Sequence, residues 1–208
     1  MRAGSQRVKR KNERIINGKY LYEYIVETLL HAKFVEDIII NTDITSVTDK
    51  YSNNKNISII KRLDSLTGNC NMNDVITDTL KHSNKNVFIQ VHATNPLLKT
   101  ETIDSAIETF FKNRKIHDSL FGVSKVQKRF WSKNGTPINH KIGDEPTTQN
   151  LEPYFEENSC FYIFSRESFK KNNNRIGINP MLFEISKIEA WDIDEEEDLM
   201  IAKSLLSL

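Results

Sequence analysis

Apolar residues along this chain recur in two alternating patterns, one typical of helices and one typical of strands. In the first pattern they stand three or four positions apart, as on one face of a helix. This spacing covers residues 21–29, 44–51, 75–80, 103–111 and 198–206. In the second pattern, short β-branched or apolar runs stand between polar residues, as buried strands do. These runs cover residues 38–40, 57–60, 87–91, 120–126 and 160–164.

Strands that alternate with helices predict an α/β sandwich with a largely parallel sheet. Ligands of such sheets bind at the carboxyl ends of the strands, so we expect functional side chains just after each strand. Asn134-Gly135 stands between two extended pieces, which predicts a β-hairpin over residues 130–138. The Asn-rich stretches 52–56 and 170–175 predict surface loops. Because no linker or internal repeat is visible, we expect residues 1–208 to form a single domain.

The composition excludes several classes of protein. The 208 residues carry a net charge of +1, which gives no overall field for nucleic acid. No apolar run approaches the roughly 18 residues that span a bilayer, and no signal-peptide pattern opens the chain. Cys70 and Cys160 lie far apart in the sequence, so we expect both to be reduced thiols, as is usual in a cytosolic protein. We therefore expect a cytoplasmic protein that binds neither nucleic acid nor membrane.

The first twelve residues are a candidate phosphate site. Ala3, Gly4 and Ser5 are small, so the backbone there can approach a ligand and direct its N–H groups at it. Five cations accompany them, namely Arg2, Arg7, Lys9, Arg10 and Lys11. Small residues with flanking cations suit a triphosphate, because cations neutralise the charge on a leaving pyrophosphate. A basic, disordered tail explains the same composition, and the segment has neither a Walker loop nor a dinucleotide-binding glycine pattern.

Near the other end, the sequence WDIDEEED is a candidate metal site. Asp192 and Asp194 alternate around Ile193, so an extended segment would point both carboxylates to the same side. Two carboxylates together with phosphate oxygens and water suit Mg²⁺. An acidic helix start is the alternative, in which Asp194 caps the helix and residues 195–197 form its first turn.

The middle of the chain offers weaker candidates. His92 directly follows a strand-like run, where ligand loops lie, although a single His is more often structural. Arg62 also follows a strand, and Asn71 and Asn73 precede a helix, where Asn commonly serves as a cap. Residues 149–163 bring amide and aromatic groups beside a strand, which packing alone also explains.

The order of these features is more specific than any one of them. The series consists of a Gly/Ser loop ending in Lys11-Asn12, Asn41-Thr42-Asp43, Arg62, Thr94-x-Pro96-Leu97, Asn158, Tyr162 and Asp192-x-Asp194 with Asp198. In this order the chain resembles the CMP-sialic acid synthetase (acylneuraminate cytidylyltransferase) family over nearly its whole length. The first and last motifs of the series are its more specific parts.

The resemblance implies a Rossmann-like three-layer α/β sandwich that binds CTP and an acidic nine-carbon sugar. The implied nucleotide-binding residues are Arg2, Ala3, Gly4, Ser5, Lys11, Asn12, Arg62, Asn71 and Asn73. The implied catalytic residues are Arg2, Lys11 and Asp194, and the implied sugar-binding residues are His92, Asn158 and Tyr162. Asp192 and Asp194 would hold the Mg²⁺ cofactor. The family also implies a homodimer, with residues 128–150 as a hairpin that protrudes towards the partner.

The implied reaction is nucleotidyl transfer. The anomeric hydroxyl of a 2-keto-3-deoxy acid sugar attacks the α-phosphorus of CTP, and CMP-sugar and pyrophosphate leave. Positioning and charge stabilisation carry such a reaction, without a covalent enzyme intermediate. Two other functions stay open, namely a nucleotidyltransferase of the same fold for another sugar and a non-catalytic nucleotide-binding descendant. A nucleic-acid binder rests only on the basic start of the chain, and the balanced charge elsewhere argues against it.

Three departures from the family pattern define further expectations. The family normally has a β-strand before the Gly/Ser loop, whereas this sequence starts at Met1 inside that motif. We therefore expect these residues to form a sheet that lacks one central strand. His92 and Ala93 stand where sialic-acid enzymes usually have Gln and Pro, so sialic, legionaminic and pseudaminic acids all stay open. Gln6 stands where family members often have Lys.

Overall fold

The computed structural model describes residues 1–5, 7–68, 70–143 and 147–207, so Gln6 lies outside the described residues. Its strands are β1 (Ile15–Ile16), β2 (Lys19–Tyr20), β3 (Ile38–Thr42), β4 (Ile57–Lys61), β5 (Val87–Val91), β6 (Ser119–Val126), β7 (Tyr154–Ser165) and β8 (Pro180–Glu184). Its α-helices are α1 (Leu21–His31), α2 (Thr45–Tyr51), α3 (Met72–Leu80), α4 (Thr100–Asn113), α5 (Arg166–Asn172) and α6 (Glu196–Leu205). Short 3₁₀ turns cover Lys11–Glu13, Asp64–Leu66 and Thr148–Asn150.

The predicted alternation of helices and strands is confirmed, and with it the α/β fold. Each of the ten segments read from apolar spacing corresponds to a helix or strand. Helix α5 was missed because it carries a single buried apolar residue, Phe169, and depends on Ser165, whose hydroxyl caps it by accepting from the Ser168 N–H. Strand β8 was missed because it begins at Pro180 on the edge of a sheet, where a proline is tolerated.

The strands form mixed sheets, so the expected mostly parallel sheet is not confirmed. One sheet has the order β5-β7-β6-β8, in which β7 is antiparallel to both neighbours and β6 is parallel to β8. A separate pair, β3 and β4, is parallel. The reason lies in the connections: α2 carries the chain from β3 to β4 as a crossover, whereas the chain leaves β6 on a long excursion and returns directly as β7.

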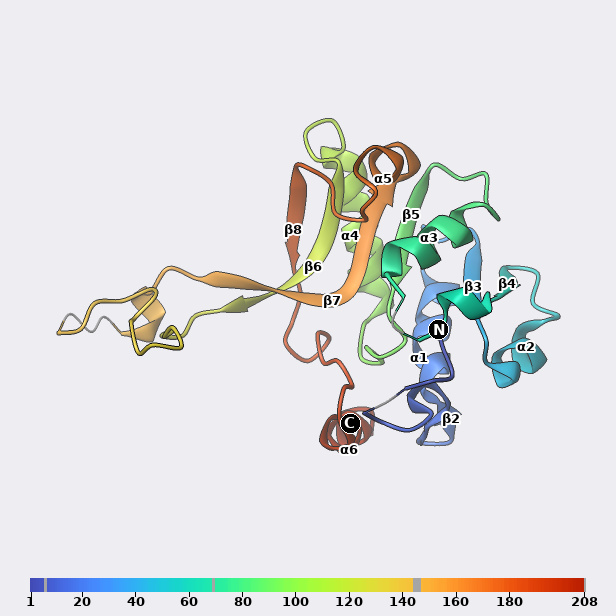
Figure 1. Cartoon of the computed structure of the whole chain (residues 1–208), viewed down its shortest axis with the longest axis horizontal. Coiled ribbons are helices and arrows are strands. Elements are labelled where there is room, and N and C mark those ends of the chain that lie inside the picture. Colours follow the sequence, from blue (N-terminus) through green and yellow to red (C-terminus); the bar gives the residue numbers. More distant parts are fainter. Residues whose placement is uncertain (6, 69, 144–146, 208) are drawn as a thin grey trace.

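Side chains of β7 show how the sheet divides the core into two layers. Phe161 and Ile163 belong to the large apolar cluster that α1 and α4 cover. Tyr162 and Phe164 point the other way, into a second cluster with side chains of α3 and α5. This alternation is what a strand buried on both faces requires. Figure 1 shows α3 and α5 on one side of the sheet and α1 and α4 behind it.

Between β6 and β7 the chain forms a long arm, defined here as residues 127–153, that extends far from the body (Figure 1). The turn predicted at Asn134-Gly135 is present: Gly135 has a φ of 78°, and the Ser132 N–H donates to the Thr136 carbonyl at 2.8 Å. A bridge between Trp131 and Pro137 completes the small hairpin. The segment predicted to protrude, residues 128–150, lies within this arm, except that residues 144–146 are outside the described part.

The sheet is interrupted between β3 and β5. Among the described residues, β3 pairs only with β4, and β5 pairs only with β7. Both strands therefore present a free edge, as expected for a sheet without one central strand. In the described part of the chain, no helix has the length and apolar character that a membrane crossing demands.

Candidate active site

A cavity of about 960 Å³ opens at the carboxyl ends of β3 and β5. Its mouth is polar, with Asn41 at the end of β3, His92 after β5 and Asp192 from the C-terminal segment. Five of the predicted nucleotide-binding residues line the same cavity, namely Arg2, Ser5, Lys11, Asn12 and Arg62. The carboxyl ends of the strands are thus where functional side chains collect, as the fold class predicts.

The cationic start of the chain meets the aspartate pair at this mouth. Buried Lys11 donates from Nζ to Asp194 Oδ1 at 3.0 Å and also to the Ile193 carbonyl. Arg7 reaches the same Asp194 oxygen at 2.5 Å. Burial by itself would raise the pKa of Asp194, but the hydrogen bonds and charges of Lys11 and Arg7 outweigh burial and lower it. The two ends of the chain, which carry the candidate phosphate site and the candidate metal site, therefore meet here (Figure 1).

The start of α6 fixes where Asp194 lies. Asp198 accepts from the backbone N–H groups of Asp194 and Glu195 at 2.9 and 2.8 Å, and Glu195 is the N-cap of the helix. The predicted capping role of Asp194 is therefore wrong, because Asp194 stands one residue before the cap and the acidic first turn consists of residues 196–198. Ile193, fully buried between the two aspartates, holds the segment against the body.

Asp192 occupies a drier position than Asp194. Burial raises the pKa of Asp192, and a hydrogen bond from the Thr94 side chain opposes this. Its Oδ1 atom is buried without a hydrogen-bond partner. A buried, unpaired carboxylate oxygen is costly unless a ligand satisfies it, which fits a divalent cation. No group of three His, Cys, Asp or Glu side chains suited to a metal occurs in the described part of the chain.

The Gly/Ser segment forms a tight turn over β3. The Ala3 N–H donates to Asp43 Oδ1 at 2.8 Å, and the Ser5 N–H donates to the Ala3 carbonyl at 3.1 Å. Arg2 donates to the Gly68 carbonyl across the cavity mouth. Ala3 and Gly4 belong to this turn without lining the cavity. Sequence reasoning did not assign Asp43 a role, although it is part of a motif that the resemblance used.

The side chains of Asn12 and Arg62 each form hydrogen bonds that connect separate segments of the site. Asn12 donates to the Arg2 carbonyl at 2.9 Å, while its own Oδ1 is buried without a partner. Arg62 donates to the side chain and the carbonyl of Asn41, both at 3.0 Å, and burial lowers its pKa. The side chain of Asn41 also donates to Asp78 of α3 at 3.1 Å, which extends this network. Sequence reasoning left Asn41 without a role.

Asn71 and Asn73 lie apart from the cavity. Asn71 caps α3 by accepting from the Asn73 N–H at 2.9 Å, and the Asn73 side chain donates to the Asn173 carbonyl at 3.0 Å. Neither residue is among those that line the cavity. Their nucleotide-binding role stays a prediction, while the capping role that the sequence also allowed is visible.

Arg175, which is not among the residues that line either cavity, contacts two of the predicted sugar-binding residues. Its guanidinium lies 3.5 Å from the centre of the Tyr162 ring, and it donates to Gln90 Oε1 at 2.6 Å. The same group stands 3.4 Å from His92 Nε2. Burial, followed by the charge of Arg175, lowers the pKa of His92 to about 4, so the ring is neutral at pH 7.

The expectation that residues 170–175 form a surface loop is wrong in two respects, because residues 170–172 belong to α5 and Arg175 is partly buried. Burial lowers the pKa of Arg175, and no carboxylate stands within ion-pair distance of it among the described residues. A cation held in this way is short of a counter-charge. An arginine at the end of an Asn-rich run carries no sequence signal for such a position, because only the folded chain brings it to Tyr162.

Asn158 lines a second, smaller cavity of about 500 Å³. A bulge produces this wall: Asn158–Phe161 of β7 stand opposite Gly122 alone on β6, and Ser159 has a φ of 59°. A Cβ on Gly122 would approach Asn158 Oδ1 to 2.9 Å, so a larger residue there would displace the Asn158 side chain. Asp192 and Asp194 line both cavities, so the aspartate pair stands at their junction.

Tyr162 contacts residues that line each of the two cavities. Its ring carries Arg175, and its hydroxyl donates to Glu157 and, at 3.2 Å, to Ser159. Burial and then the bond to Glu157 raise the pKa of Tyr162 to about 12. The three predicted sugar-binding residues thus do not share one cavity: His92 lines the larger, Asn158 lines the smaller, and Tyr162 is not among the lining residues of either.

Comparisons with known proteins agree with this geometry. Among curated proteins, the chain is 27% identical to post-translational flagellin modification protein B of Campylobacter coli, over 99% of this chain and 92% of that protein. It is 28% identical to CMP-N,N'-diacetyllegionaminic acid synthase of Campylobacter jejuni, over 100% of this chain and 92% of that protein.

The fold is similar to that of a solved CMP:2-keto-3-deoxy-manno-octonic acid synthetase in complex with CTP. The TM-score is 0.73 at 14% identity, and the match covers 100% of this chain and 95% of the other. The model of a family described as cytidylyltransferase matches residues 1–205. Because that match spans nearly every residue from the cationic turn to the end of α6, the chain belongs to the cytidylyltransferase family.

Proposed function

We propose that this protein couples CTP to a 2-keto-3-deoxy acid sugar of the nonulosonic type, giving CMP-sugar and pyrophosphate. As a member of its family the chain is a CTP-dependent nucleotidyltransferase, and a relative that matches the whole of this chain is named for a legionaminic acid product. One observation carries the proposal: Asp194, bonded to Lys11 and Arg7, stands with Asp192 between two cavities. A reaction that joins two substrates needs two compartments that meet at the reacting atoms.

In this arrangement the larger cavity receives the nucleotide at its polar mouth. Arg2, Lys11 and Arg62 supply positive charge for the triphosphate, and the unpaired Oδ1 of Asn12 is free to accept from the nucleoside. The sugar oxygen forms a bond to the α-phosphorus, the bond from that phosphorus to the pyrophosphate oxygen breaks, and the hydroxyl proton passes to solvent. The cations stabilise the charge that gathers on the departing pyrophosphate.

The proposal includes Mg²⁺ as cofactor, held by Asp192 and Asp194. The unpaired oxygen of Asp192 and the ionised state of Asp194 suit a hard cation that keeps phosphate oxygens and water among its ligands. When bound, Mg²⁺ would neutralise phosphate charge and polarise the reacting phosphate. Before it binds, Lys11 and Arg7 compensate the charge of Asp194.

A two-way substrate panel tests the proposed function. Pyrophosphate release is measured with CTP, UTP or GTP against sialic, legionaminic and pseudaminic acids and a neutral hexose, with and without Mg²⁺. We expect release with CTP, with one or more nonulosonic acids, and only with the metal. Release with another nucleotide or a neutral sugar would replace this function, and Mg²⁺-dependent thermal stabilisation by CTP without any release would indicate a binding protein.

Arg175 is proposed to pair with the carboxylate of the acid sugar. Replacing it, Arg175→Leu, is expected to raise the KM for the sugar by about tenfold to a hundredfold, because a charge-assisted contact is lost, and to leave the KM for CTP unchanged. Steady-state kinetics with each substrate varied in turn measures both constants. Arg175→Lys should recover part of the loss, and Lys171→Leu on the exposed face of α5 serves as control. An unchanged sugar KM in the leucine variant would remove Arg175 from the sugar site.

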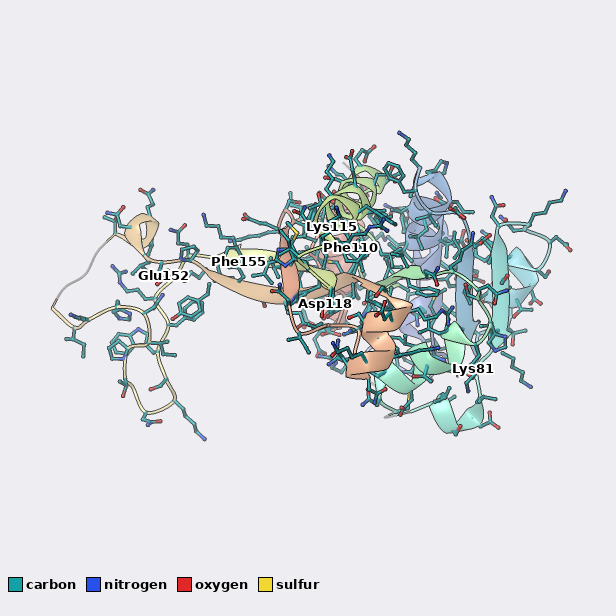
Figure 2. The ribbon with its side chains drawn as sticks, turned by 90° about the horizontal axis from the view of Figure 1, so that it is seen from above. Lys81, Phe110, Lys115, Asp118, Glu152 and Phe155 are labelled. Carbon is teal, nitrogen blue, oxygen red and sulfur yellow. The ribbon has the colours of Figure 1, made fainter. Side chains whose placement is uncertain are left out.

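We also propose that the arm joins two copies of the chain into a homodimer. Its apolar side chains are unusually open to solvent: Trp131 is 51% exposed, Ile138 55% and Ile142 76%. Tyr154 and Phe155, where the arm returns to β7, are each 45% exposed. Figure 2 shows Glu152 on the arm and Phe155 near the start of β7, both away from Phe110 in the body. Apolar side chains gathered on a protruding segment are characteristic of an interface.

Sedimentation over a wide range of protein concentration checks the dimer. Combining Trp131→Lys with Ile142→Lys is expected to weaken self-association by at least about a hundredfold, because two exposed apolar anchors become charged. Ile178→Lys, which changes a 76% exposed isoleucine of the body in the same way, should leave association unchanged. Equal effects of the arm and body variants would contradict the role of the arm.

A further inference from the structure

The loop between α5 and β8, residues 173–179, brings Arg175 to Tyr162. Asn173 ends α5 in the left-handed conformation, with a φ of 47°, which asparagine adopts more readily than most residues. The side chain of Arg175 is long and has several rotatable bonds. Its place over the Tyr162 ring therefore depends on how firmly the backbone of this loop is held.

Asp118 binds the end of the loop. It stands one residue before β6, and its Oδ2 accepts from the Ile178 N–H at 2.8 Å, while its Oδ1 accepts from the Asn179 N–H at 3.2 Å. The Asp118 N–H donates to the Asn179 carbonyl at 3.3 Å. The next residue, Ser119, is buried and accepts at Oγ from the Gly177 N–H at 2.8 Å. Three consecutive N–H groups of the loop are thus bound by two adjacent side chains at the start of β6, and two of these bonds are charge-assisted.

Gly177 allows the loop to approach Asp118 closely. A Cβ at this position would lie 2.1 Å from Asp118 Oδ1 and 2.3 Å from its Cγ and Oδ2. A side chain would fit there only if the carboxylate left the two N–H groups that it binds. The glycine and the aspartate are therefore a matched pair, in which the missing side chain of one makes room for the carboxylate of the other.

The start of the loop is bound as well. The Asn73 side chain donates to the Asn173 carbonyl at 3.0 Å. Within the loop, Asn174 Oδ1 accepts from the Ile176 N–H at 3.0 Å, and Ile176 packs against the apolar cluster on the α3 and α5 side of the sheet. Arg175 lies midway between the two bound ends, so its backbone has little freedom to move.

We propose that Asp118 is a positioning residue for the sugar: it holds the loop in the conformation that places the Arg175 guanidinium over Tyr162, where the carboxylate of the acid sugar binds. This inference rests on the proposed pairing of Arg175 with that carboxylate. Asp118 acts through the loop backbone and not through contact with a substrate. In a loop released from Asp118, Arg175 occupies several positions and only a fraction of the molecules can bind the sugar, which weakens binding by that fraction.

Kinetic constants of matched variants test the proposal. Asp118→Ala is expected to raise the KM for the sugar by about tenfold and to leave the KM for CTP within about twofold of the parent, because only Arg175 is displaced. Asp118→Asn keeps one accepting oxygen and should give a smaller rise. Asp104→Ala is the control, since this carboxylate binds the Lys33 and Phe34 N–H groups of another loop in the same way, at 3.1 and 3.2 Å. It should change neither constant.

A double-mutant cycle tests the contact between Gly177 and Asp118. Gly177→Ala alone should raise the sugar KM about as much as Asp118→Ala, because the added Cβ displaces the carboxylate. In the Asp118→Ala background the same Cβ meets no carboxylate, so Gly177→Ala should add less than about twofold. Effects that multiply to about a hundredfold in the double variant would overturn the proposal.

The ionisation of His92 reports on the position of Arg175 without any substrate. Burial and then the charge of Arg175 hold the pKa of His92 at about 4, so displacement of Arg175 should let that pKa rise towards the usual value for histidine. NMR of the histidine rings between about pH 4 and pH 7 measures the change, and His92→Gln identifies the signal. We expect the pKa to rise in Arg175→Leu and in Asp118→Ala, and to stay unchanged in Asp104→Ala.

The outcomes separate this inference from the pairing on which it rests. An unchanged sugar KM and an unchanged His92 pKa in Asp118→Ala would overturn the positioning role. Equal rises in the KM for sugar and for CTP would also overturn it, because they would indicate a general loss of structure. A normal sugar KM in Arg175→Leu would overturn the pairing and with it the role in sugar binding, whereas a raised His92 pKa in Asp118→Ala would still show that Asp118 places Arg175.

Discussion

Replacing Asp194 by asparagine is expected to lower kcat by about a hundredfold to a thousandfold. Asparagine has nearly the same shape and can still accept from Lys11, so the segment before α6 keeps its place. The negative charge that would hold Mg²⁺ is lost, and Asp192 alone supplies a weaker site. The variant should need far more Mg²⁺ for half-maximal rate, which a metal titration of pyrophosphate release measures.

The fold of the Asp194→Asn variant should survive. The side chain of Asp194 is 40% exposed, and ion pairs that open to solvent contribute little to the free energy of unfolding. Its thermal midpoint should therefore stay within a few degrees of the parent. Glu197→Gln removes the same charge from an exposed position three residues on and should keep normal turnover. Near-normal turnover in Asp194→Asn would take that residue out of the metal site.

The second large effect is expected from Lys11→Met. Methionine fills much of the buried volume of Lys11 but cannot donate to Asp194 or to the Ile193 carbonyl. Losing one buried cation beside the triphosphate should lower kcat/KM for CTP by about a hundredfold. Because Lys11 is one of the groups that lower the pKa of Asp194, that pKa should rise, and the acid limb of the pH–rate profile should move to higher pH.

The pH profile separates this role from mere packing. Loss of packing alone would lower the rate without moving the acid limb. Lys9→Met, in the same segment but exposed, is the matched control and should change neither quantity. An unshifted acid limb together with normal kcat/KM in Lys11→Met would show that Lys11 has no part in the site.

Sequence reasoning found the two segments that the site depends on, the cationic start of the chain and the aspartate pair near its end, because the chemistry of each segment is local. A cationic segment and two alternating aspartates can be recognised from residue type and spacing, whereas the roles of Lys11 and Asp194 were implied by the family resemblance. Arg175, Gln90 and Asn41 could not be found in this way. Each acts only through a neighbour distant in sequence: Arg175, for example, stacks on Tyr162 and bonds to Gln90, 85 positions away.

The fold, too, could be predicted from the sequence only in part. Apolar spacing located helices such as α4 and strands such as β5, because burial imposes a period on the sequence. It could not give the direction of β7, since an antiparallel return after the arm and a parallel crossover produce the same buried run of residues 160–164. Asn71 is the converse case: its cap is a local contact, with the N–H of Asn73 two positions on, so residue type and place in the sequence were enough to predict it.

The bulge opposite Gly122 has a consequence for how the molecule could be controlled. Strands β6 and β7 run from the arm into the body, and the bulge lies where the two parts join. Asn158 and Glu157, which frame the smaller cavity, sit on that joint. A second subunit resting against the far end of the arm would therefore pull on the strands that shape the cavity. The room available to the second substrate would then be a property of the assembly and not of one chain.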